Sequence, residues 1–141
     1  MGLFLYLLKL RAMKLNVNNE TSRLRAVVLG IADSEGGVPK LSEAYDPKSI
    51  EHIKAGTYPK EEDMVKELDA VAAVLAKYDV QVFRPELIEN YNQIFTRDIA
   101  FVIEDKIVKA NILPERQQEI HAIDYVLDQI EEDKVITLPE A

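Results

Sequence analysis

The chain has 141 residues, enough for one domain with a modest core; 48% of them are hydrophobic and 30% are charged. Acidic residues outnumber basic ones by 25 to 17, which gives a net charge of -8. An acidic surface repels phosphate backbones and anionic lipid, so the composition argues against nucleic-acid or membrane binding through basic residues. There is no cysteine, which excludes disulfides, zinc–thiolate sites and a thiol nucleophile within these residues. The lack of cysteine fits a reducing compartment, and we expect a cytoplasmic protein.

The first residues form a short apolar segment. Residues 1–8 are far too few to span a bilayer, which takes about 20 residues. They also lack the basic start and the small-residue cleavage site of a secretory signal. Met13 and the four residues after it resemble a natural start. We therefore expect residues 1–12 to be an extension outside the fold, the alternative being an ordinary first strand or helix turn.

A first strand–helix–strand unit is predicted up to residue 85. Residues 24–31, rich in Val and Leu with Gly30 after their apolar centre, predict a buried strand. Residues 32–60 are interrupted by glycine and proline, which predicts a long irregular connection of the kind that is often functional. Pro59 and the acidic residues after it predict a helix start. The helix carries an apolar stripe formed by Met64, Val65, Leu68, Val71, Ala72 and Leu75.

After a predicted strand at residues 80–83, the pattern repeats with an added hairpin. Residues 98–103 and 106–110 predict two strands joined by a tight turn at Glu104-Asp105. Pro114 predicts the start of a second helix, and residues 134–138 predict a last short strand. Interleaved strands and helices of this kind indicate an α/β fold. The stripe of the second helix consists of Ile120, Ile123, Val126, Leu127 and Ile130.

The residues that point to chemistry are Phe95, Thr96, Arg97 and Asp98, where a loop enters a strand. A carboxylate suits a guanidinium ligand because its two oxygens can accept two parallel N–H bonds. An aromatic face can stack on the same planar cation, and Arg116 is a candidate for holding a substrate carboxylate. The alternative is a surface ion pair between Arg97 and Asp98, which would contribute little. Phe95 would then be ordinary core and Arg116 a solvated helix residue.

Residues 92–111, which contain this Phe-Thr-Arg-Asp element and the predicted hairpin, resemble the amidinotransferase, arginine deiminase and dimethylarginine dimethylaminohydrolase superfamily. Residues 19–24 and 27–30 also resemble that family's first strand. The likeness covers residues 13–141 and is closest to bacterial amidinotransferase-like proteins. It implies an incomplete pentein-type α/β propeller of about two ββαβ modules. It also implies a guanidino-group-modifying enzyme that acts on arginine or another guanidino compound.

The resemblance also implies roles for single residues. Asp98 would be the guanidinium-binding carboxylate, Phe95 would line the pocket, Arg97 would support it, and Arg116 would be a candidate substrate-carboxylate anchor. In the family a cysteine attacks the guanidino carbon and a histidine acts as general acid and base, with no metal or other cofactor. The cysteine is missing here, and neither of the two histidines, His52 and His121, matches the family histidine.

The family's Glu-Gly-Gly-Asp element would follow residues 138–140, so we expect an amino-terminal part that is inactive alone. Such a part would leave strand edges unpaired and apolar faces open, and we expect it to associate with itself as a homo-oligomer or aggregate. Two other functions stay open. One is a non-catalytic pentein-like binding or assembly module, and the other is a small α/β domain of unknown role.

Overall fold

A computed structural model describes residues 13–44 and 46–139. The described chain forms two units, one of residues 26–94 and one of residues 13–25 and 95–139. Both contain strands and helices in alternation, which confirms the predicted α/β class. No helix among the described residues is long and apolar enough to cross a membrane. The predicted extension, residues 1–12, lies outside the described residues.

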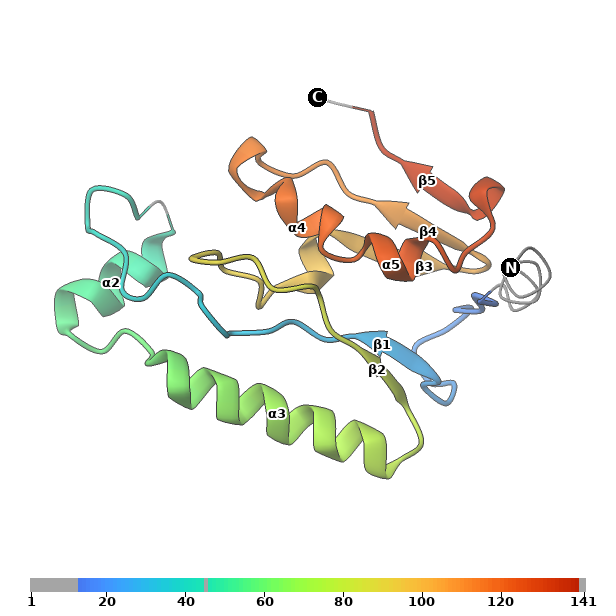
Figure 1. Ribbon diagram of the computed structural model, residues 1–141, viewed down its shortest axis with the longest axis horizontal. Helices are drawn as coiled ribbons and strands as arrows, with labels where there is room; N and C mark the ends of the chain where they lie inside the picture. The colour runs from blue at the N-terminus through green and yellow to red at the C-terminus, as the bar shows by residue number, and fades with distance from the viewer. Residues whose placement is uncertain (1–12, 45, 140–141) are drawn as a thin grey trace, which may run out of the picture. The chain divides into compact units, whose positions relative to one another are not determined.

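The unit of residues 26–94 is built on two parallel strands (Figure 1). Strand β1 (Ala26–Val28) pairs with β2 (Gln81–Phe83), with Val27 opposite Val82. Parallel neighbours need a crossover connection, which here contains the helices α2 (Pro47–Ala55) and α3 (Glu61–Lys77). Both strands therefore lie within the segments that the sequence predicts, but each is shorter than its predicted segment.

Helix α2 lies inside the connection that the sequence predicts to be irregular, so that prediction was wrong. Asp46 caps the helix by accepting the backbone N–H of Ser49 at 2.7 Å. Pro47 occupies the first turn, and Gly56 ends the helix with a φ of 66°. Proline and glycine here mark the two ends of a helix. The same residues are also common in loops, so their presence in the sequence does not distinguish the two.

Helix α3 begins at Glu61, close to the predicted start, and carries acidic residues in its first turn. The predicted apolar stripe is half-buried, and no residue of the helix is fully buried. Val71 is 46% exposed and Val74 is 55% exposed. The helix contacts β2, so its packing on the two-stranded sheet covers only part of its apolar surface.

The second unit contains the predicted hairpin. Strands β3 (Ala100–Ile103) and β4 (Lys106–Lys109) are antiparallel, and Glu104 in the tight turn between them has a φ of 53°. Strand β5 (Val135–Thr137) pairs in parallel with β4, which gives the order β3-β4-β5 (Figure 1). Strand β3 starts later than predicted because Asp98 belongs to a 3-10 turn, η1 (Thr96–Asp98), that precedes the strand.

The predicted second helix is not continuous, which corrects the sequence interpretation. It consists of the 3-10 turn η2 (Pro114–Arg116) and the short helices α4 (Gln118–His121) and α5 (Asp124–Leu127). A further 3-10 turn, η3 (Glu132–Lys134), leads into β5. The break falls at Ile123, whose φ of -115° lies outside the helical range. Ile123, Val126, Leu127 and Ile130 of the predicted stripe are nevertheless buried.

Backbone contacts between distant residues complete each unit. In the second unit, Val17 and Glu104 exchange two hydrogen bonds, of 2.9 and 2.8 Å. In the first unit, the backbone N–H of Ile31 donates to the carbonyl of Gln93 at 3.2 Å. The Gln93 side chain is fully buried, accepts the N–H of Ile88 and donates to the carbonyl of Glu86. It thereby holds the loop that leads out of β2.

Candidate functional site

The turn η1 and Phe95, the residue before it, present three side chains just before β3. The backbone of the turn closes with a 3.0 Å hydrogen bond from the Asp98 N–H to the carbonyl of Phe95. The Arg97 side chain is 82% exposed and that of Asp98 is 39% exposed. The Arg97 guanidinium lies 5.5 Å from the centre of the Phe95 ring, within range of a cation–π contact. An aromatic face, a cation and a carboxylate are thus presented together at the surface of this unit.

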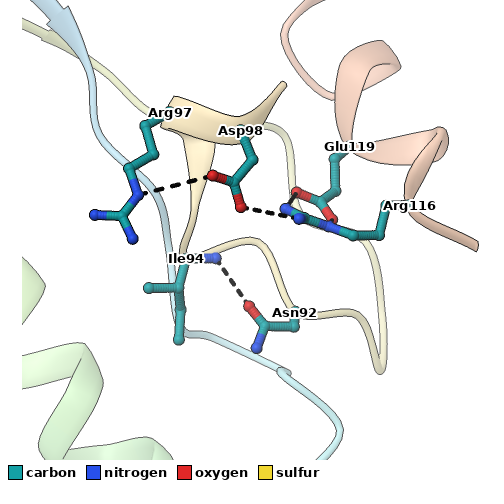
Figure 2. A network of polar contacts seen from close by, with 6 residues as sticks. All are labelled: Asn92, Ile94, Arg97, Asp98, Arg116 and Glu119. Atoms are coloured by element: carbon teal, nitrogen blue, oxygen red, sulfur yellow. Dashed lines mark hydrogen bonds and ion pairs between the residues drawn. The ribbon is translucent and has the colours of Figure 1, made fainter. Parts of the chain in front are cut away.

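The Asp98 carboxylate contacts two guanidinium groups. Oδ2 accepts a hydrogen bond from Nη1 of Arg116 at 2.9 Å, while Oδ1 lies 3.7 Å from Nε of Arg97. The second distance is too long for a hydrogen bond, so it marks only an ion pair. Figure 2 shows Asp98 between the two arginines, with one oxygen toward each. The carboxylate therefore already holds one guanidinium N–H and keeps an oxygen without a close donor.

Arg116 is held from the other side by Glu119. Its Nε and Nη2 donate to the two carboxylate oxygens of Glu119 at 2.6 and 2.9 Å. The Glu119 side chain is only 4% exposed, and that of Arg116 is 23% exposed. The pKa of Arg116 is raised, first by its hydrogen bond to Glu119 and then by its contact with Asp98, against the opposing effect of burial. Arg116 is therefore permanently charged and held rigidly.

The structure brings together the four residues for which the sequence predicts a role in binding. Phe95, Arg97 and Asp98 lie within a stretch of four residues, and Arg116 reaches Asp98 across eighteen residues of sequence. Glu119 is the residue that sequence reasoning missed. The sequence feature that could have identified it is its position three residues after Arg116, since side chains three residues apart on a helical turn face one another.

Neither histidine belongs to this network. Nδ1 of His52 lies 2.9 Å from the Thr57 hydroxyl in the first unit. Nδ1 of His121 lies 3.1 Å from the Asp124 carboxylate, with its side chain 76% exposed. No group of His, Asp or Glu residues within residues 13–44 and 46–139 is arranged to hold a metal ion.

A second polar cluster lies in the first unit, around Ser34. Its backbone N–H donates to Glu61 at 3.1 Å, and its hydroxyl donates to Glu89 at 2.9 Å. Next to it Glu35 is only 8% exposed. Burial raises the pKa of Glu35, and the nearby Glu61 charge raises it further. The hydrogen bonds of Ser34 connect the start of α3 to the loop after β2, which is a structural function.

Two solved structures share this fold. One is the inosamine-phosphate amidinotransferase StrB1 from Streptomyces griseus, at 23% identity and a TM-score of 0.66, over 93% of this chain and 44% of that chain. The other is SxtG, an amidinotransferase from Microseira wollei in the saxitoxin biosynthetic pathway, at 19% identity and a TM-score of 0.62, over 90% and 42%. The chain thus spans less than half the length of either. No family model and no curated protein matches the chain.

Proposed function

We propose that the chain is the amino-terminal part of an amidinotransferase-type enzyme and binds the guanidinium of an arginine-like substrate through Asp98. The observation that carries the proposal is the contact of Asp98 with a guanidinium, that of Arg116, at 2.9 Å. A carboxylate that accepts one guanidinium N–H in a partly exposed setting has the chemistry to accept a second. The fold shared with two amidinotransferases over nine-tenths of the chain supports the same class.

The neighbouring side chains suit the two ends of such a substrate. Phe95 and Arg97 would form the wall of the pocket, with the exposed aromatic face stacking on the planar guanidinium. Arg116 would anchor a substrate carboxylate. Three of its N–H groups donate to Glu119 and Asp98. Because an arginine carries five N–H donors, two remain for a ligand.

We propose that the fold is part of a pentein-type propeller. The order β3-β4-α4-α5-β5 corresponds to one ββαβ module, and β1-α3-β2 corresponds to a second, less complete one. The domain would begin at residue 13, with residues 1–12 as an extension. These 141 residues contain no cysteine, so they would contribute substrate binding while a nucleophile for the covalent step would come from elsewhere.

The binding proposal is tested by titrating the 141-residue chain with L-arginine and with agmatine, which lacks the carboxylate, while recording amide chemical shifts. We expect both ligands to shift the signals of residues 95–98 and arginine to bind more tightly. Asp98→Asn should abolish the shifts. The matched control, Asp128→Asn, removes the same charge from an exposed position of the same unit and should bind like wild type. Equal binding by wild type and Asp98→Asn would refute the assignment.

The missing cysteine also favours a second candidate, a non-catalytic binding module of the same fold. The coding sequence after residue 141 distinguishes the two. A frame that continues into Glu-Gly-Gly-Asp, a histidine and a cysteine would support the enzyme. A stop codon with no such sequence downstream would support the module.

A further inference from the structure

Glu119 is the most deeply buried charged side chain of the site, at 4% exposure. A buried carboxylate is costly unless it is paired and hydrogen-bonded, and here both of its oxygens accept N–H groups of Arg116. This bidentate pair fixes the plane of the guanidinium. Only Nη1 of Arg116 is directed toward Asp98, where it donates one hydrogen bond (Figure 2).

The charges of the three residues do not cancel. Asp98 and Glu119 contribute two negative charges and Arg116 contributes one positive charge, which leaves one negative charge on the group. Because Glu119 balances Arg116, the charge of Asp98 stays available to another cation. The other cation near Asp98 is Arg97. Its side chain is 82% exposed and its Nε lies 3.7 Å from Oδ1 of Asp98, so it is a weak, displaceable partner.

We propose that Glu119 is a positioning residue, which restricts Arg116 to one hydrogen bond with Asp98 and so reserves a carboxylate oxygen for the ligand guanidinium. This inference rests on the proposed function of Asp98. Without the charge of Glu119, the Nε and Nη2 donors of Arg116 are released. Arginine and carboxylate then favour a bidentate pair, and Arg116 occupies both oxygens of Asp98. The chain's own guanidinium would take the place of the ligand.

The test measures the dissociation constant of methylguanidine by amide shifts in the full chain. This probe has no carboxylate, so any anchoring function of Arg116 does not enter. Glu119→Gln keeps the side-chain shape and should weaken binding by about tenfold or more, since a charge-assisted hydrogen bond is lost to the competing arginine. Adding Arg116→Gln to Glu119→Gln removes the competitor. The double variant should recover binding to within about threefold of wild type.

This rescue separates positioning from a merely structural function. If the double variant binds as weakly as Glu119→Gln, or if Glu119→Gln binds like wild type, the inference is overturned. The proposed function would still hold as long as Asp98→Asn abolishes binding. If Asp98→Asn binds like wild type, the assignment of Asp98 itself fails, and the inference fails with it.

A measurement on the wild-type chain covers the case in which Glu119→Gln does not fold. The Nε–H signal of Arg116 should keep its chemical shift when methylguanidine saturates the site, because the ligand adds to Asp98 while the pair with Glu119 persists. A move of that signal to the position of a free arginine would show that Arg116 leaves Glu119 when the ligand binds, which contradicts the inference.

Discussion

Among the glycines of the described residues, Gly30 lies closest to the backbone of another segment. Replacing it with alanine should be strongly destabilising. A Cβ atom at this position would lie 2.1 Å from the carbonyl oxygen of Ile94. It would also lie 2.6 Å from the carbonyl oxygen of Gln93. Carbon and oxygen atoms in contact are normally about 3.3 Å apart or more. The neighbouring backbone would therefore have to move by about 1.2 Å, since a carbonyl cannot rotate away as a flexible side chain can.

The cost follows from what that movement disrupts. Overpacking a well-packed site costs about 1–3 kcal/mol. The displaced segment also carries the 3.2 Å hydrogen bond from Ile31 to Gln93, and its loss adds about 1 kcal/mol. We therefore expect Gly30→Ala to lower the free energy of unfolding by about 2–4 kcal/mol. For a chain of this length the melting temperature should fall by roughly 10 °C.

Gly37→Ala is the matched control, measured with Gly30→Ala by thermal and urea unfolding followed by circular dichroism. Gly37 has a φ of 73° and no atom within 4 Å of the added Cβ. Its alanine variant should lose only about 1 kcal/mol, from backbone strain. Equal losses in the two variants would mean that the close approach at Gly30 does not control stability. A loss below about 1 kcal/mol in Gly30→Ala would refute the packing argument outright.

Four further outcomes are expected. Because burial and Glu61 raise the pKa of Glu35 above its ordinary 4.5, the folded state holds that proton more tightly, so this contribution to stability falls as the pH rises through the raised pKa. Glu35→Gln should remove this dependence. The urea midpoint of the variant, compared with that of wild type, should therefore be higher at pH 7 than at pH 4. The hydrogen bond from Lys134 lowers the pKa of Asp105 to about 2, so its stabilisation is present above pH 3.8 and lost as the pH falls toward 2. Asp105→Asn should be less stable than wild type at pH 7, and the two proteins should converge near pH 2. Removing residues 1–12 should leave the melting temperature unchanged, and a clear drop would show that they pack into the fold. Light scattering over a range of concentrations should show self-association, whereas a 16 kDa monomer throughout would contradict it.

The sequence predicted the positions of most elements because hydrophobic periodicity and turn residues act locally. The hairpin at Glu104-Asp105 and the two strands joined through α3 follow from such signals. Pairing between strands distant in sequence, such as β4 with β5, is not encoded by any local pattern. The apolar stripe from Ile123 onward was predicted to be buried, and it is, although the backbone breaks at Ile123 itself. Burial was thus easier to predict than the conformation that achieves it.

In the candidate site, the residue types were predictable from the sequence, but the hydrogen bonds and ion pairs between them were not. Asp98 and Arg97 were recognisable from residue chemistry, but an arginine can be a ligand anchor, a surface charge or a structural ion. Which of these Arg116 is depends on its neighbours, and the decisive neighbour is Glu119, a residue whose type suggests a solvated surface position. Its 4% exposure results from the packing of this unit as a whole. Because the buried carboxylate of Glu119 balances the charge of Arg116, the charge of Asp98 stays available to the guanidinium ligand that we propose.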